Sequence, residues 1–201
     1  SRIGDFRGIV DYLERMRGND VDSLELLQNI GRKKGVELNE QQWAELAWCW
    51  YEPLSYMGHP EDGIIETLDT LRGRLGLKLG IVSNTFVPGV TLDRHLEREG
   101  IRDYFSPRIY SCHAGFRKPD RRIYEMAAEQ IGERCQRIRF IGEQMAEEAE
   151  RPLELGPRPG PREAWTNKGK AIPAKAWRIE RLSELVGIVE KINAETEEQV
   201  A

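Results

Sequence analysis

Residues 78–85, with the sequence KLGIVSNT, are the stretch that decides the fold. A short apolar run bounded by glycine and polar residues predicts a strand buried on both faces, and such strands are typical of parallel sheets flanked by helices. The run ends in three small polar side chains, Ser83, Asn84 and Thr85. Ligands bind at this end of the strands in open α/β sheets, so these side chains are candidates for holding an anion. Alternatively, Ser83 and Asn84 only turn the chain, because both residue types are common in turns.

After this strand the chain alternates between strand and helix patterns. Such alternation predicts repeated βαβ units and an α/β fold with a parallel sheet flanked by helices. The loop at 156–161 is too rich in proline to pair inside a sheet. The expected strands are 78–83, 108–111, 138–142 and 163–166, and the expected helices are 64–73, 90–99, 120–131, 144–155 and 182–192.

The residues that precede the sheet are expected to be helical. Apolar residues recur at helical spacing in 9–16 and 21–30, and Asn39 followed by Gln42 predicts a capping box at the start of a third helix. The tryptophans and tyrosines of this region favour a small apolar core over a ligand site. We therefore expect a helical, cap-like subdomain over residues 1–56, an α/β core over 57–194 and a flexible tail over 195–201.

Composition excludes several functional classes. The 201 residues have a net charge of -4, 32% charged residues and no apolar run of membrane-spanning length. The sequence therefore predicts a globular protein with no nucleic-acid partner and no membrane partner. The first 20 residues lack the apolar centre of a signal peptide, so the expected location is the cytoplasm. The oligomeric state stays open.

The cysteines and histidines do not suggest a metal motif. Cys49, Cys112 and Cys135 are odd in number and widely spaced, which fits neither a disulfide framework nor a zinc motif. His113 follows Cys112 directly, but adjacent residues on a strand point to opposite faces. We therefore expect the cysteines to be reduced and structural, and a metal site of Cys and His is not expected.

Two further stretches place charged side chains near the same sheet edge. In GFRKPD, residues 115–120, Pro119 suits the first position of a helix, which places Lys118 at the helix start. In RFIGEQ, residues 139–144, a strand pattern ends in Glu143, and Glu148 follows one helical turn later. Two acids in this arrangement are candidate ligands for Mg²⁺, which prefers oxygen ligands. Alternatively, Lys118 and Glu148 are solvated surface residues.

The order of these three stretches resembles the second, third and fourth motifs of the haloacid dehalogenase-like (HAD) hydrolase superfamily. The similarity covers about residues 60 to 190, and the helical region before it resembles the cap of these enzymes. The resemblance implies a doubly wound, Rossmann-type sheet and an Mg²⁺-dependent phosphatase that acts on a small phosphorylated substrate through an aspartate nucleophile. It also implies that Ser83, Asn84 and Thr85 bind the phosphoryl group, that Lys118 neutralises its charge, and that Glu143 and Glu148 ligate Mg²⁺.

The sequence departs from the family's pattern at two points. Glu143 stands where the fourth motif has aspartate, and no apolar strand ending in Asp-x-Asp is present. The nearest match is Asp5, with Arg7 in the place of the second acid. The resemblance therefore leaves two alternatives: a phosphomonoester phosphatase-type hydrolase with an incomplete amino terminus, or a non-catalytic relative that binds a phosphorylated ligand or a protein partner. Dehalogenation would need the same missing aspartate.

The missing strand has a structural consequence. In the family this strand lies between the two strands that correspond to 78–83 and 138–142 here. Without it, the backbone groups on the facing edges of these two strands have no partner among the predicted strands. We expect the two strands to stay apart, because their flanking helices are suited to a wider sheet. A direct ladder between Ile81–Val82 and Phe140–Ile141 would instead indicate a rearranged sheet.

Overall fold

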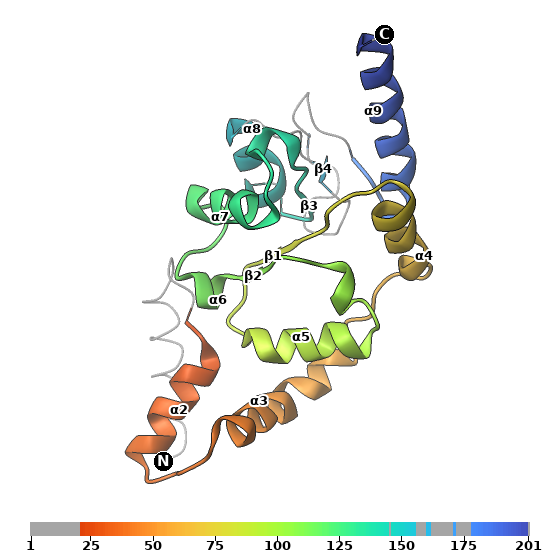
Figure 1. Ribbon diagram of the computed structural model, residues 1–201. Helices are drawn as coiled ribbons and strands as arrows, with labels where there is room; N and C mark the ends of the chain where they lie inside the picture. The colour runs from red at the N-terminus through yellow and green to blue at the C-terminus, as the bar shows by residue number, and fades with distance from the viewer. Residues whose placement is uncertain (1–20, 145, 156–159, 162–170, 172–177, 201) are drawn as a thin grey trace.

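The computed structural model describes residues 21–144, 146–155, 160–161, 171 and 178–200. It confirms a helix-rich α/β fold with parallel strand pairing. The α2–α3 pair lies at one end of the molecule and α9 at the other, with β1 and β2 between them (Figure 1). The helices are α2 (Ser23–Lys33), α3 (Glu40–Ser55), α4 (Ile64–Asp69), α5 (Gly89–Arg98), α6 (Ser111–Ala114), α7 (Arg121–Ile131), α8 (Arg151–Leu155) and α9 (Glu184–Val200), with shorter turns η1 (Thr70–Arg74), η2 (Arg102–Tyr104), η3 (Cys135–Arg137) and η4 (Ala146–Glu150).

The strands form two separate parallel pairs. β1 (Ile81–Ser83) pairs with β2 (Arg108–Tyr110), and β3 (Ile141–Gly142) pairs with β4 (Gly160–Pro161). Within the described residues no ladder joins β1 to β3. The expected separation of these two strands is therefore confirmed, and the rearranged sheet is not observed there.

β1 is shorter than the predicted strand 78–83 because its first half runs irregularly beside Pro107. Ser106 donates a backbone hydrogen bond to Leu79 O (2.8 Å), and Ile81 donates one to Pro107 O (2.9 Å). A side chain at position 80 would place its Cβ only 3.1 Å from that same Pro107 oxygen. Gly80 therefore allows the two backbones to approach closely before the regular ladder begins.

Two apolar clusters lie on opposite faces of the chain at β1. Residues three apart on an extended segment point to opposite faces, and Leu79 and Val82 accordingly enter different clusters. Val82 packs with residues of β2 and α7, and Leu79 packs with residues of α4 and α5. The buried members of the first cluster are Ile109, Ile123, Tyr124, Ala127 and Phe140, and those of the second are Ile64, Leu68 and Ile101. Helices thus cover both faces, as a doubly wound sheet requires.

The helices before the sheet confirm the predicted capping box. Asn39 Oδ1 accepts from Gln42 N, and Gln42 Oε1 accepts from Asn39 N, each at 2.9 Å. Trp43 and Trp48 are buried, as expected for a small core, but Trp50 is 49% exposed. Trp50 is therefore not part of the predicted small core, because α5 packs on the side of α3 that carries Trp48.

Three element boundaries differ from the predictions. β4 lies at Gly160–Pro161, before the predicted strand 163–166 and inside the loop that was judged too rich in proline to pair in the interior of a sheet. Pro161 is accommodated because β4 has a single strand neighbour in the described residues, so its missing N–H interrupts no second ladder. α7 begins after Pro119, with Asp120 as the N-cap that accepts from Arg122 N at 2.9 Å. α9 continues to Val200, through the stretch expected to be a flexible tail.

Two expected elements, the helix at 9–16 and the strand at 163–166, lie outside the described residues. The predicted strand 108–111 ends one residue early, since Ser111 begins α6. Cys112 and His113 therefore lie on a helix and not on a strand, which removes the argument that their side chains point apart.

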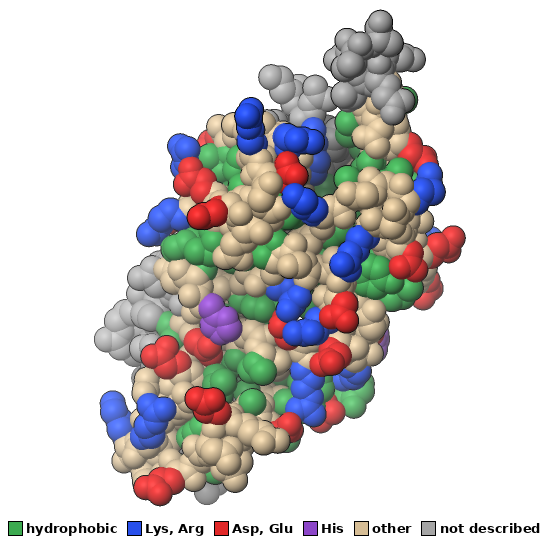
Figure 2. All heavy atoms as spheres, in the orientation of Figure 1, with side chains coloured by type: hydrophobic (Ala, Val, Ile, Leu, Met, Phe, Trp, Pro, Cys, Tyr) green, Lys and Arg blue, Asp and Glu red, His purple; other side chains and the backbone are tan. Residues whose placement is uncertain are grey.

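The described surface carries charges of both signs. Lys, Arg, Asp and Glu side chains are interspersed over the face seen in Figure 2, and ion pairs such as Arg94–Glu45 (2.9 Å) join neighbouring helices. No helix among the described residues is both long enough and apolar enough to cross a membrane.

Asp93 on α5 ties the helix layer to β2. Its carboxylate accepts hydrogen bonds from Arg108 Nε (2.9 Å) and from the Tyr110 hydroxyl (2.6 Å). Burial alone would raise the pKa of Asp93, but the hydrogen bonds from Arg108 and Tyr110 and the charges of Arg108 and Arg102 outweigh it and hold the pKa below its usual value. A depressed carboxyl pKa stabilises the fold above the unfolded-state pKa, and this stability is lost as the pH falls through the folded-state pKa.

Asp93→Asn should lower the free energy of unfolding at about pH 7 by about 1 to 3 kcal/mol, because it leaves Arg108 without its anionic partner. The loss should shrink in urea titrations as the pH falls below the unfolded-state pKa of about 4 toward the lower folded-state pKa of Asp93.

Asp103→Asn is the matched control, because this carboxylate is 93% exposed and its Arg102 pair is long at 3.4 Å. It should change stability by less than about 0.5 kcal/mol. An equal effect of the two substitutions would contradict the role assigned to Asp93.

Candidate active site

The side chain of Asn84 joins three segments at the carboxyl end of β1. Its Oδ1 accepts from Lys118 N (2.7 Å), and its Nδ2 donates to Lys118 O (2.9 Å) and to Glu147 Oε1 (2.8 Å). The two opposed bonds to the backbone of one residue fix the amide orientation, since its oxygen faces a donor and its nitrogen faces an acceptor. Asn84 therefore holds the 115–120 loop against the end of β1.

The residues on either side of Asn84 have different surroundings. Ser83 is the last residue of β1 and is half-buried. Thr85 instead contacts the next strand, because its N–H donates to Ser111 Oγ at 2.8 Å. Its own hydroxyl accepts from Val87 N at 2.9 Å and closes the turn into α5. Ser111 is fully buried and was missed by the sequence analysis, although a small hydroxyl residue ending a strand pattern was a visible signal.

Lys118 is largely buried and faces two carboxylates. Its Nζ bonds Glu148 Oε1 and lies 3.7 Å from Glu147 Oε2. Only 11% of the Lys118 side chain and 6% of the Glu148 side chain are exposed. Charges removed from water to this degree are stable only when they are paired, so each of these side chains depends on the other. The alternative of a solvated surface lysine is therefore wrong for Lys118.

Glu148 lies directly against the carboxyl end of β3. Its Oε2 accepts from Gln144 N at 2.8 Å. A side chain at position 142 would overlap the Glu148 side chain, so this approach requires Gly142. Glu143, half-buried, lies between these two backbone contacts. Glu148 therefore contacts the backbone on both sides of Glu143. It is also linked to the end of β1, because it pairs with Lys118, whose backbone is bonded to Asn84.

Glu147 belongs to the same group, although the sequence analysis selected only its neighbour. Besides its contacts with Asn84 and Lys118, its backbone oxygen accepts from the Tyr124 hydroxyl at 2.5 Å. Burial raises the pKa of Glu147; the Lys118 charge opposes this effect and the Glu148 charge adds to it. The sequence did not reveal the conformation of η4, which lets the consecutive residues Glu147 and Glu148 both face Lys118.

Mg²⁺ is the metal that the resemblance implies, and the donor types at this site fit it. Glu143, Glu147 and Glu148 would offer carboxylate oxygens, the ligands that Mg²⁺ prefers. Both oxygens of Glu148 already accept hydrogen bonds, from Lys118 and Gln144. A metal at Glu148 would therefore have to replace at least one of these contacts.

Two hollows in the described surface lie away from this group. Each has a volume of about 790 Å³. One lies beside the end of α7, at Gly132 and Arg137, and the other lies between α3, α5 and β2, at Trp48 and Tyr110. Neither is lined by Ser83, Asn84 or Lys118. Chemistry and not cavity size marks the candidate site.

Solved structures with a similar fold include phosphatases and hydrolases. The HAD phosphatase from Thermococcus onnurineus superposes with a TM-score of 0.59 at 21% identity, covering 81% of this chain and 69% of that chain. A predicted phosphoglycolate phosphatase from Haemophilus somnus 129PT gives a TM-score of 0.59 at 18% identity, covering 85% and 78%. The putative HAD-hydrolase YfnB from Bacillus subtilis, bound to magnesium, gives 0.52 at 17% identity, covering 86% and 93%.

A curated relative shares part of the sequence. Over 73 residues the chain is 37% identical to the pyrimidine 5'-nucleotidase YjjG of Escherichia coli (strain K12). The match covers 36% of this chain, and it spans 31% of the length of the relative.

The sequence model of the haloacid dehalogenase-like hydrolases matches residues 6–149. This region contains the ends of β1 and β3, the Lys118 loop and the two acids that face the lysine. It covers well over half of the 201 residues. The chain therefore belongs to the haloacid dehalogenase-like hydrolase family.

Proposed function

We propose that this chain is a phosphomonoester phosphatase-type member of its family, and that the phosphoryl group of a small substrate binds between Ser83 and Lys118. The observation that carries the proposal is the hydrogen-bonded group of Asn84, Lys118, Glu147 and Glu148, which connects the ends of β1 and β3. Phosphoryl transfer depends chiefly on placing positive charge and donors around the transferring group. In this proposal Lys118 supplies the positive charge and Ser83 supplies a donor, at the carboxyl ends of β1 and β3.

The three residues at the end of β1 take different roles in this proposal. Ser83, half-buried at the strand end, donates its hydroxyl to a phosphoryl oxygen. Asn84 acts by positioning Lys118, because both N–H groups of its amide already donate to other residues. Thr85 orients the turn between β1 and α5. Direct contact of Asn84 with phosphate would require Glu147 to move away.

Charge balance explains why Mg²⁺ would accompany the substrate. Lys118 carries one positive charge, and Glu147 and Glu148 oppose it with two negative charges. A phosphate dianion added to this group meets net repulsion unless a cation is added too. Glu143 and Glu148 would hold Mg²⁺, which supplies electrostatic stabilisation of the phosphoryl oxygens when bound. Lys118 would then be released from Glu148 to face the phosphate.

The substrate class follows from chemistry and from the relative. A pyrimidine 5'-nucleotidase acts on a nucleoside monophosphate, and we extend that class to this chain as the first substrate to test. In this proposal residues 1–56 form the cap that selects the substrate, and residues 57–194 form the core that holds the phosphoryl group. The exposed Trp50 and Phe86, whose rings contact each other with centroids 6.0 Å apart, lie on the two parts.

A non-catalytic role is the second candidate, and one observation favours it. Lys118 is neutralised by acids of its own chain, and no Asp-x-Asp follows an apolar strand in the 201 residues. A protein of this kind would bind a phosphorylated ligand without cleaving it. Binding and turnover therefore have to be measured separately.

Phosphate binding should depend on both Mg²⁺ and Ser83. In calorimetric titrations with inorganic phosphate, Ser83→Ala should weaken binding by about tenfold or more, because a hydrogen bond to a charged group contributes about 1.5 to 3 kcal/mol. Removing Mg²⁺ with a chelator should abolish the binding signal. Ser183→Ala, an exposed serine just before α9, is the control and should bind like the parent chain. Phosphate binding that is unchanged both by Ser83→Ala and by removal of Mg²⁺ would contradict the proposed site.

Turnover by these 201 residues is expected to stay at background with a general phosphomonoester and Mg²⁺, because covalent catalysis needs a positioned nucleophile. Release of p-nitrophenol from p-nitrophenyl phosphate measures it. Hydrolysis above background that disappears on Asp5→Asn would overturn this expectation. If the coding sequence upstream of Ser1 contains an apolar strand with Asp-x-Asp, the extended protein should hydrolyse the same ester.

Glu147→Gln should stabilise the fold at about pH 8 and have little effect at about pH 4. The folded-state pKa of Glu147 is raised, so its contribution to stability is present below the unfolded-state pKa and is lost as the pH rises through the folded-state pKa. A neutral amide of the same shape avoids that loss. Urea unfolding at the two pH values measures it, and Glu129→Gln on the exposed side of α7 should change stability by less than about 0.5 kcal/mol at either pH.

A further inference from the structure

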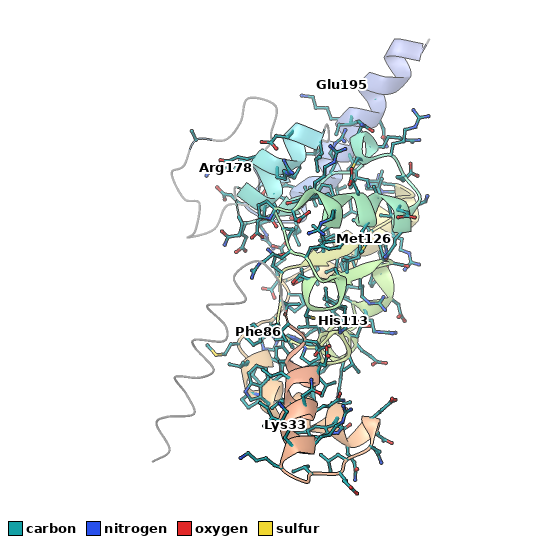
Figure 3. All side chains as sticks on the ribbon, turned by 90° about the vertical axis from the view of Figure 1, so that its left-hand side faces the viewer. Lys33, Phe86, His113, Met126, Arg178 and Glu195 are labelled. Atoms are coloured by element: carbon teal, nitrogen blue, oxygen red, sulfur yellow. The ribbon has the colours of Figure 1, made fainter. Side chains whose placement is uncertain are left out.

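Three potential metal ligands meet where α2 joins the core. The ligand atoms of Asp22, Cys112 and His113 all lie within 4.8 Å of one another. His113 Nε2 lies 2.8 Å from Asp22 Oδ2. The labelled His113 and Phe86 both lie near the end of α2 in Figure 3, and the Phe86 carbonyl accepts from Ser23 N at 3.2 Å. Side chains far apart in the sequence are thus gathered at one junction.

The surroundings hold each ligand in place. Asp22 is the N-cap of α2, and its Oδ1 accepts from Leu24 N at 2.7 Å, which turns Oδ2 toward the cluster. The His113 ring contacts the Tyr110 ring edge-on, and a Cβ at position 89 would lie 2.6 Å from His113 Cε1. Gly89 therefore leaves space that the imidazole occupies. Cys112 is buried, and its thiol makes a weak hydrogen bond to Val87 O at 3.5 Å.

The geometry is close to that of a tetrahedral zinc site. Zinc bonds of about 2.0 to 2.3 Å place neighbouring ligand atoms about 3.5 Å apart. The Asp22–His113 pair, now at hydrogen-bond distance, would open by roughly 0.7 Å. The Cys112 sulfur lies within 4.8 Å of the other two ligand atoms and would have to move inward by no more than about 1.3 Å. His113 is 51% exposed, so water can reach a fourth position.

We propose that Asp22, Cys112 and His113 bind one Zn²⁺-class cation, with water as the fourth ligand, and that the ion joins α2 to α6. A thiolate and an imidazole select zinc over magnesium, because Mg²⁺ prefers oxygen ligands alone. Binding transfers the Cys112 thiol proton to solvent, as thiolate coordination requires. The site is separate from the Lys118 group and uses none of its residues.

The competing explanation is a hydrogen-bonded ion pair beside a buried cysteine. Asp22 and His113 could join α2 to the core without a metal, and buried cysteines commonly act as small apolar residues. The two explanations differ in one measurable property. Only a metal site brings the Cys112 sulfur into direct contact with an added cation.

Titration of the reduced, purified 201-residue chain with Co²⁺ tests the proposal. The expected result is a thiolate-to-cobalt charge-transfer band that saturates at one ion per chain and is displaced by Zn²⁺. Cys112→Ala should lose the band completely. Asp22→Asn and His113→Gln should each weaken Co²⁺ binding by at least about tenfold to hundredfold, which is the usual cost of losing a residue that only supports a ligand. Asparagine is also suited to N-capping, so Asp22→Asn keeps the cap of α2.

Matched controls separate this site from other binding. Cys49→Ala and Cys135→Ala remove the other two cysteines and should keep the band at full intensity. Cobalt at the carboxylates near Lys118 would give no thiolate band, so the band itself distinguishes the two sites. Circular dichroism checks that Cys112→Ala remains folded, and Asp22→Asn provides an independent reading if it does not. No band with the parent chain, or a band that survives in Cys112→Ala, would overturn the proposal.

Discussion

The pair of hydrogen bonds between the Asn84 side chain and the Lys118 backbone is the constraint on which the candidate site depends. It links the end of β1 to the loop before α7, so the lysine occupies a defined place although it lies on a loop. The Asn84 side chain also satisfies the backbone N–H and C=O of Lys118, so these two polar groups are not buried without hydrogen-bond partners. The same bonds therefore hold the fold together and fix the position of Lys118 in the candidate site.

Lys118 and Glu148 show why stability and function are coupled here. Removing one partner of a buried ion pair leaves an uncompensated charge, which typically costs about 3 to 5 kcal/mol. A substrate and a metal would compete for the same two side chains, so part of their binding energy would be used to separate the pair. The close contact of Glu148 with Gly142 fixes the position of the Glu148 side chain in the ion pair.

Local rules succeeded where neighbouring residues decide the outcome. The capping box at Asn39 forms as predicted because both of its partners lie within one helical turn. They did not anticipate β4, where pairing depends on how many strands lie beside Pro161. They failed at Cys112 and His113, because helix α6 follows strand β2 directly. Trp50 was also misplaced, because the position of α5 decides which side of α3 is covered.

The sequence by itself determined the α/β class and the family resemblance and selected the candidate residues, because apolar periodicity and short motifs are local properties of the chain. Only the tertiary structure decided which of these residues meet. It brought Glu147 to Asn84, turned Thr85 toward Ser111, and placed Asp22 beside Cys112 and His113. The physical reason is that hydrogen bonds and ligand contacts depend on distances of a few ångströms between segments far apart in sequence, which are set by helix packing and loop geometry.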